Sequence, residues 1–131
     1  MKKALEFLQE SGTFYLATTE GDQPRARPFG AVIEYEGKLY ILTNNKKECF
    51  KQMLQNPKVE ISSMNKKGQW IRVTGEVAND ERREVKELAL EAYPSLKSMY
   101  SLDDGIMAVL YFTKGTATIS SFNAEPETFT L

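Results

Sequence analysis

Short stretches rich in β-branched and aromatic residues, each closed by turn residues, constrain the fold of this chain more than any other feature. Such stretches are typical of β-strands, because branched and aromatic side chains pack well on a pleated surface. Glu36-Gly37 and Lys114-Gly115 each separate two of these stretches, which indicates two hairpins. The predicted strands cover residues 13–19, 25–35, 38–43, 59–64, 70–77, 106–112 and 116–122.

Three other stretches carry apolar residues at helical spacing. Residues 2–11 and 46–55 predict two helices, and Asp80 is the expected N-cap of a third helix, which Pro94 closes. The chain has 131 residues, which favours a single domain, 1–131. The pattern of elements favours the α+β class, with mainly β structure. We expect an antiparallel β-barrel of six to seven strands with peripheral helices.

The residue types exclude several classes of function. Seventeen Lys and Arg against eighteen Asp and Glu leave a net charge of -1, so nothing favours nucleic acid or an anionic membrane as a partner. The absence of histidine excludes imidazole-bound zinc or haem and histidine-based catalytic triads, and no metal site is expected. The single Cys49 cannot form an internal disulfide, which fits the reducing cytoplasm. Any chemistry would therefore use a borrowed cofactor.

The most informative stretch for binding lies between residues 40 and 48. A predicted strand ends in Thr43, Asn44 and Asn45, and a predicted helix then begins with Lys46 and Lys47. Unpaired N–H groups at a helix N-terminus attract phosphate, whereas lysines in the first turn conflict with the helix dipole unless an anion is bound. The stretch therefore predicts a phosphate site or, as the alternative, a solvated basic turn.

Two other stretches place cations on strands. Arg25 and Arg27 share one face of a strand in which Pro28 indicates an edge or a bulge. This pair fits an anionic ligand and, equally well, a charged edge that prevents aggregation. Trp70 and Arg72 also share a face, where they would pack over a planar ring or, as tryptophans more often do, cap a core or a dimer interface.

In this order, these motifs resemble the pyridoxamine 5'-phosphate oxidase-like proteins, which are FMN-binding split β-barrels. The resemblance covers nearly the whole chain, and the ending is similar to that of the short bacterial members. It implies a split barrel and a homodimer with FMN at the subunit interface. The residues that carry it are 23–29, 40–44 with the following lysines, Asn56-Pro57, 70–75 and 115–122.

The resemblance also implies roles for particular residues. Arg27 would lie against the flavin and its phosphate, and the backbone of Pro28 and Phe29 would face the isoalloxazine ring. Thr43 matches a threonine that contacts FMN, and Arg72 matches a basic residue nearby. The expected cofactor-binding residues are Arg25, Arg27, Pro28, Phe29, Thr43, Asn44, Asn45, Lys46, Lys47, Trp70 and Arg72.

The chain departs from the family pattern at several of these positions. Trp70 stands where the true oxidases have a glutamine. The Arg-Lys pair that grips the phosphate in those oxidases is replaced by Glu48 and Cys49, so we assign the phosphate to Lys47 first and to Lys46 second. Cys49 itself falls on the apolar stripe of the helix and is expected to be a buried packing residue.

The resemblance therefore predicts a cytoplasmic, homodimeric FMN-binding flavoprotein that acts as an oxidoreductase on a small molecule. Pyridoxamine phosphate oxidase activity is not expected: the oxidases hold pyridoxal phosphate with a C-terminal segment that contains Trp, Arg and His, whereas this chain ends at Leu131 with no histidine and no second tryptophan. The alternatives are a flavin-binding sensor or carrier without turnover, a barrel that binds F420 or haem, and a ligand-free barrel. The sequence identifies no catalytic residue, and residues 93–105 predict either a lid or a simple connection.

Overall fold

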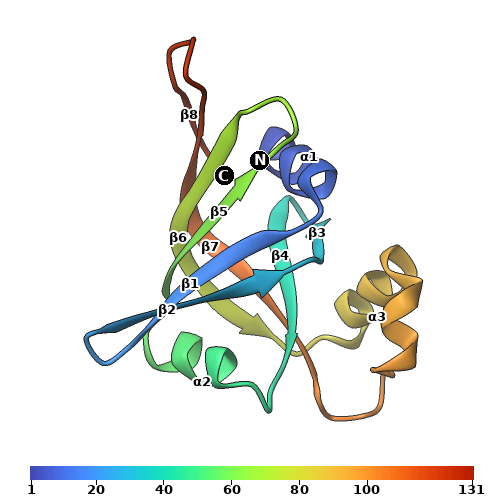
Figure 1. Ribbon diagram of the computed structural model, residues 1–131. Helices are drawn as coiled ribbons and strands as arrows, with labels where there is room; N and C mark the ends of the chain where they lie inside the picture. Colours follow the sequence, from blue (N-terminus) through green and yellow to red (C-terminus); the bar gives the residue numbers. More distant parts are fainter.

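The computed structural model describes residues 1–131 and contains one eight-stranded sheet with three α-helices and a short 3-10 helix (Figure 1). The strands are β1 (Phe14–Glu20), β2 (Gln23–Phe29), β3 (Val32–Tyr35), β4 (Lys38–Asn44), β5 (Lys58–Met64), β6 (Trp70–Asp80), β7 (Met107–Ser120) and β8 (Glu127–Thr130). The helices are α1 (Lys2–Ser11), α2 (Glu48–Gln55), α3 (Arg83–Ala92) and the 3-10 helix η1 (Pro94–Ser98). The expected α+β, mainly β architecture is confirmed.

The sheet curls but does not close into a continuous barrel, because the strands at its two ends do not pair. Its strands follow the order β2-β1-β5-β6-β7-β4-β3, with β8 paired to β7 outside this path, and every pairing is antiparallel. The path begins at β2 and ends at β3, which are consecutive in the chain but do not pair. As an edge strand, β2 tolerates Pro28, whose nitrogen has no hydrogen to donate to a neighbouring strand.

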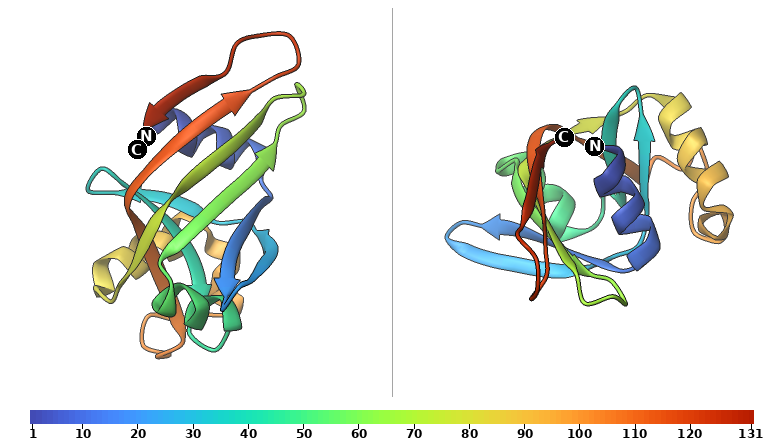
Figure 2. Two further views of the ribbon diagram at one scale, coloured as in Figure 1. Left: turned by 90° about the vertical axis from the view of Figure 1, so that its left-hand side faces the viewer. Right: turned by 90° about the horizontal axis from the view of Figure 1, so that it is seen from above.

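The main core fills the inside of the curled sheet. Figure 2 shows α1 and α2 at opposite ends of the sheet, and α3 outside it. The strands supply fully buried side chains such as Leu16 and Ile61, and the helices supply Leu8 of α1 and Met53 of α2. A second, smaller cluster forms where α3 packs its apolar face against β3, β4 and β7. Burial of their apolar faces fixes the helices against the sheet, and each helix fixes the start of the loop that follows it.

One predicted hairpin is wrong, because Lys114-Gly115 does not reverse the chain. Residues 107–120 form the single long strand β7, which pairs with β6 along its length, with β4 in its first half and with β8 in its second half. The register with β6 shifts after Glu76, where Thr113 is the extra residue of a β-bulge. A bulge bends a strand, and here it lets β7 turn from one part of the sheet to the other.

Other element boundaries also differ from the prediction. The expected strand 25–35 is two strands, because the chain leaves the sheet at Gly30-Ala31 between β2 and β3. Asp80 ends β6 and does not cap α3; its carboxylate accepts the backbone N–H of Arg82 at 3.0 Å. Strand β8 carries no alternation of apolar and polar residues and was not predicted.

Helix α2 begins at Glu48, two residues later than predicted. Lys47 is the N-cap, with extended backbone angles, and Lys46 precedes it. The first turn therefore carries the acidic Glu48, which the helix dipole favours. The predicted conflict between two lysines and the dipole does not arise, so it gives no argument for a bound anion.

Candidate functional site

A cavity of about 300 Å³ lies where β2 and β4 end, and we call it the β2–β4 cavity. Residues 28–31 and Leu42 and Thr43 line one side, and the segment that follows α3 lines the other. Lys47 is the one charged residue in the lining. The volume is at the lower end of the range for pockets that hold small molecules, and a mostly apolar lining with few polar groups is typical of such pockets.

Packing fixes the side chains on the strand side of this cavity. Phe29 is 8% exposed, and its ring centroid lies 6.0 Å from that of the buried Phe14. The ammonium of Lys47 lies 5.9 Å from the Phe29 centroid, within range of a cation–π contact. The Thr43 hydroxyl lies 3.7 Å from the Cys49 sulfur, and both residues are buried. The expectation that Cys49 is a buried packing residue is confirmed.

Residues 93–105, which we call the roof segment, line the side of the cavity opposite the strand ends. The roof segment contributes Tyr93, Ser95, Leu96, Met99 and Tyr100 to the lining, none of which carries a charge. The Tyr93 hydroxyl donates to the carbonyl of Val32 at 3.0 Å and accepts its N–H at 3.1 Å. The Tyr100 hydroxyl accepts a hydrogen bond from Asn44 at 2.8 Å. Two tyrosines thus pin the roof segment to β3 and β4.

Arg27 does not line the β2–β4 cavity but lies against α2. Its Nη1 donates to the carbonyl of Leu16 at 3.2 Å and to the hydroxyl of Thr18 at 2.7 Å. Its Nη2 donates to Oε1 of Gln52 at 2.9 Å. No carboxylate lies within 4.0 Å of this guanidinium. Arg27 is therefore a partly buried cation that is held by neutral groups.

Other residues expected at the site have partners of their own. Arg25 pairs with Glu20 at 2.9 Å on the surface, which matches the alternative of a charged sheet edge. Asn45 donates from its side chain to the carbonyl of Gly105 at 2.8 Å and so helps to hold the roof segment. Lys46 is exposed. Among the expected residues, the cavity brings together Pro28, Phe29, Thr43 and Lys47.

Trp70 and Arg72 lie on the outer face of the sheet and share no lining with the β2–β4 cavity. Trp70 packs against Phe122, with 5.0 Å between the ring centroids. Tyr15, Met64 and Phe122 around it are 53%, 60% and 90% exposed, and we call these three residues with Trp70 the aromatic patch. They line an open groove of about 460 Å³. Arg72 is exposed on the same face of β6.

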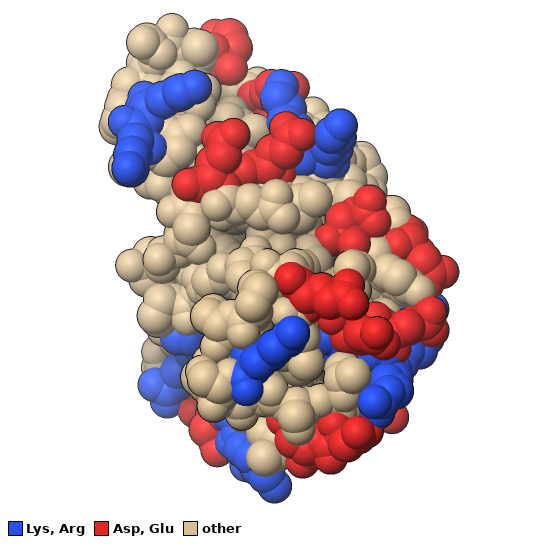
Figure 3. Space-filling model, turned by 90° about the vertical axis from the view of Figure 1, so that its right-hand side faces the viewer, with Lys and Arg blue, Asp and Glu red and all other residues tan.

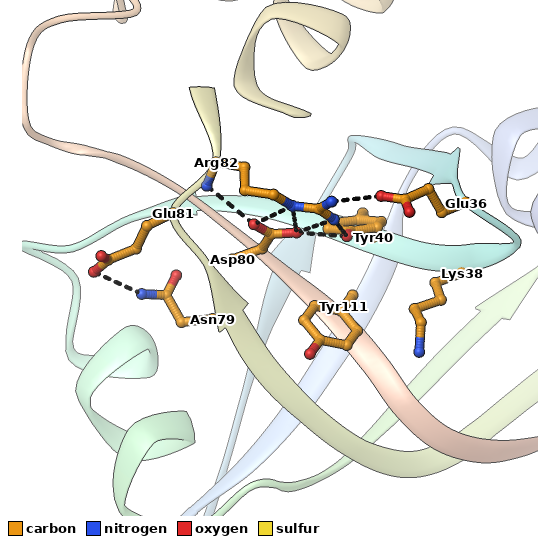
Figure 4. A pocket seen from close by; sticks show the side chains of 8 residues that line it. All are labelled: Glu36, Lys38, Tyr40, Asn79, Asp80, Glu81, Arg82 and Tyr111. Carbon is orange, nitrogen blue, oxygen red and sulfur yellow. Dashed lines mark hydrogen bonds and ion pairs between the residues drawn. The ribbon is translucent and has the colours of Figure 1, made fainter. Parts of the chain in front are cut away.

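A larger cavity, of about 600 Å³, contains an ion cluster in which the charges satisfy one another (Figure 4). Arg82 bridges Asp80, at 2.9 Å, and Glu36 on the turn between β3 and β4. The Tyr40 hydroxyl donates to Asp80 at 2.7 Å. Hydrogen bonds from Arg82 lower the pKa of Asp80 to about 2, and burial raises the pKa of Tyr40 to about 12. We interpret this cluster as a structural link between β4, β6 and the start of α3.

The surface agrees with the near-zero net charge. Figure 3 views the side that carries α3, where acidic and basic side chains both occur, so no field of a single sign covers this face. None of the helices is long and apolar enough to cross a membrane. No three His, Cys, Asp or Glu side chains gather closely enough to hold a metal ion.

Sequence reasoning missed two buried polar residues beside Arg27. Gln52 is 6% exposed on the buried face of α2, and Thr18 is 3% exposed on the inner face of β1. Both stand where the periodicity of the element predicts an apolar side chain: Gln52 is three residues after Cys49, and Thr18 is two after Leu16. A polar residue at a core position is the signal that would have identified them.

Comparison with known proteins gives a family match over almost the whole chain. The family profile described as pyridoxamine 5'-phosphate oxidase matches residues 1–125. The crystal structure of a NimC/NimA family protein from Clostridium acetobutylicum is 80% identical in sequence, with a TM-score of 0.98 over 100% of this chain and 92% of that chain. No curated protein sequence matches this chain.

More distant structures share the fold. A pyridoxamine 5'-phosphate oxidase-related, FMN binding protein from Nostoc punctiforme is 11% identical, with a TM-score of 0.61 over 98% of this chain and 90% of that chain. A heme binding protein from Mycobacterium smegmatis is 15% identical, with a TM-score of 0.76 over 97% of this chain and 57% of that chain. The split-barrel architecture expected from the sequence is confirmed.

Proposed function

The chain belongs to the pyridoxamine 5'-phosphate oxidase family, and on that premise we propose that it is a flavoprotein oxidoreductase. Residues 1–131 would act as one domain that binds FMN non-covalently. When bound, the flavin supplies the redox chemistry, accepting or releasing hydride or electrons. The single observation that carries the proposal is the β2–β4 cavity, an apolar pocket with one cation in its lining.

The donor set beside this cavity fits a flavin phosphate. The side chains of Pro28, Phe29 and Leu42 offer an apolar surface to a planar ring. Lys47 and Arg27 are cations without a carboxylate partner within 4.0 Å, and a phosphate would pair with them through charge-assisted hydrogen bonds. Thr43 also lines the cavity. This chain would therefore bind, orient and shield the ring.

A second subunit would complete the site. Trp70 and Arg72 are remote from the β2–β4 cavity within one chain, so any contact they make with FMN would come from a homodimer partner. The aromatic patch supports this arrangement, because contiguous exposed apolar side chains mark interaction surfaces. The lone, buried Cys49 is consistent with a cytoplasmic protein.

An alternative function is a flavin-binding sensor or carrier without turnover. The β2–β4 cavity would bind and shield the ring in the same way in this case. F420 is a second alternative for the cofactor. Haem has weaker support, although a distant relative is described as a heme binding protein, because this chain has no histidine to serve as an axial ligand.

The test is to purify the protein, record its absorbance spectrum and identify the released cofactor by mass. A flavin spectrum with the mass of FMN supports the proposal, and an F420 or haem spectrum contradicts it. NADH or NADPH is then added without oxygen, followed by a small acceptor. Reduction and reoxidation of the bound flavin support an oxidoreductase, whereas a flavin that neither donor reduces favours the sensor or carrier.

A further inference from the structure

The guanidinium of Arg27 keeps two of its five N–H groups free of partners in the chain. Its Nη1 hydrogens go to the Leu16 carbonyl and the Thr18 hydroxyl, and one Nη2 hydrogen goes to Gln52. The Nε–H and the second Nη2–H make no hydrogen bond within the protein. A guanidinium has five N–H donors in a rigid fork, so these two remain for another acceptor.

The two free N–H groups lie on the same edge of the guanidinium. Gln52 Oε1 lies 2.6 Å from the Thr18 hydroxyl, which itself bonds Nη1. Gln52 therefore approaches the end of the guanidinium, between Nη1 and Nη2. The side edge, formed by the Nε–H and the outer Nη2–H, stays free. That edge is one of those through which arginine binds carboxylates and phosphates with two parallel hydrogen bonds.

Gln52 and Thr18 are costly groups to place in a core. They are 6% and 3% exposed, and burying an amide or a hydroxyl is unfavourable unless its hydrogen bonds are made inside the protein. The Thr18 hydroxyl donates to Gln52 and accepts from Arg27, and the Gln52 amide nitrogen lies 3.4 Å from a Glu20 oxygen. Their mutual hydrogen bonds fix both oxygens so that they face Arg27.

We propose that Gln52 and Thr18 are positioning residues, which hold the Arg27 guanidinium so that its free edge receives the phosphate of the bound flavin. This inference rests on the proposed function. An arginine that is already fixed loses little conformational entropy when the phosphate binds, so affinity rises without a new contact. Lys47 offers a contrast, because the residue is exposed and its ammonium lies 5.9 Å from the Phe29 ring centroid, with no hydrogen bond that fixes it.

Comparing FMN with riboflavin tests this role, because the two flavins differ only in the phosphate. We measure the dissociation constants of both for the wild-type protein and for Gln52→Met and Thr18→Val, which remove the polar groups with little change in size. We expect FMN to bind about tenfold more weakly to each variant, equivalent to about 1.4 kcal/mol, and riboflavin to change by less than about twofold. Gln55→Met on the exposed face of α2 is the matched control, and Thr18→Ser should retain wild-type affinity for FMN.

The outcomes separate this inference from the proposed function. Equal weakening of FMN and riboflavin in the Gln52 and Thr18 variants would assign them a structural role only and overturn the inference. Unchanged FMN affinity in both variants overturns it as well. If, in that case, Arg27→Met still weakens FMN selectively, the proposed phosphate contact stands and only the positioning role fails. If the wild-type protein binds neither flavin, the proposed function fails together with the inference.

Discussion

Replacing Asp80 with asparagine tests whether the ion cluster stabilises the fold. The Asp80 carboxylate accepts hydrogen bonds from the Tyr40 hydroxyl at 2.7 Å, from the Arg82 backbone at 3.0 Å and from the Arg82 guanidinium at 2.9 Å. The residue is 7% exposed. Asp80→Asn keeps the shape but removes the charge, and it turns an amide donor toward groups that are themselves donors. We therefore expect the variant to be less stable.

The magnitude follows from the pKa of Asp80. The hydrogen bonds from Arg82 lower this pKa from 3.8 to about 2, and one pKa unit corresponds to about 1.4 kcal/mol, so the ionised carboxylate contributes about 2 kcal/mol. Because the folded-state pKa is depressed, this contribution is complete above about pH 5 and is lost as the pH falls through 3.8 toward 2. At pH 3, about half of it should remain.

The assay is urea unfolding followed by circular dichroism at pH 7, 5, 4 and 3. The free energy of unfolding of Asp80→Asn should lie about 2 kcal/mol below the wild-type value at pH 7, and the gap should narrow below pH 4. Asp22→Asn is the control, because Asp22 is exposed and makes no ion pair. A gap of the same size at pH 7 and pH 3 would refute the reasoning.

Four further predictions concern the cavity and the sheet. Lys47→Ala should weaken FMN binding by about 2 kcal/mol, or about thirtyfold, in calorimetric titration, and unchanged affinity would remove Lys47 from the phosphate site. Tyr100→Phe removes the acceptor that pins the roof segment, so amide hydrogen exchange in residues 93–105 should accelerate while exchange in the sheet does not. Gly75→Ala would place a Cβ 2.2 Å from the Lys114 carbonyl oxygen and should destabilise the fold by about 3 kcal/mol in urea unfolding; a neutral effect would contradict the close approach of β6 and β7. Burial raises the pKa of Tyr40 to about 12, so wild-type stability should fall as the pH rises from 10 toward 12 and Tyr40→Phe should lack that loss.

Most of the sheet was predictable because local chemistry specifies it. The stretch from Phe14 to Glu20 alternates buried and exposed residues, and the positive φ angles of Glu36 and Gly37 form the turn that their sequence indicates. The failure at Lys114-Gly115 has a physical reason. Gly115 pairs with Gly75 inside the sheet, where a Cβ would lie 2.9 Å from the Thr74 carbonyl oxygen. The glycine is therefore required by the close approach of β6 and not by a turn, and only the long-range pairing of β7 with β6 shows this.

The candidate site was predictable in part. Pro28, Phe29, Thr43 and Lys47 meet at one cavity, because strand ends and the start of the next helix lie close together in a curled sheet. The partner of Arg27 was not predictable, since Gln52 is 25 residues away in the chain and comes from another element. A single sequence carries no record of such a contact, beyond the oddity of an amide on an apolar helix face.

The most direct test of the central claim is a titration of the cofactor-free protein with FMN, followed by flavin fluorescence and by the mass of the complex in solution. We predict that one FMN binds per chain, that the complex has the mass of a dimer, and that riboflavin binds more weakly. A protein that binds neither flavin, or that binds both with equal affinity, would contradict the assignment of the β2–β4 cavity to a flavin and of Lys47 and Arg27 to its phosphate.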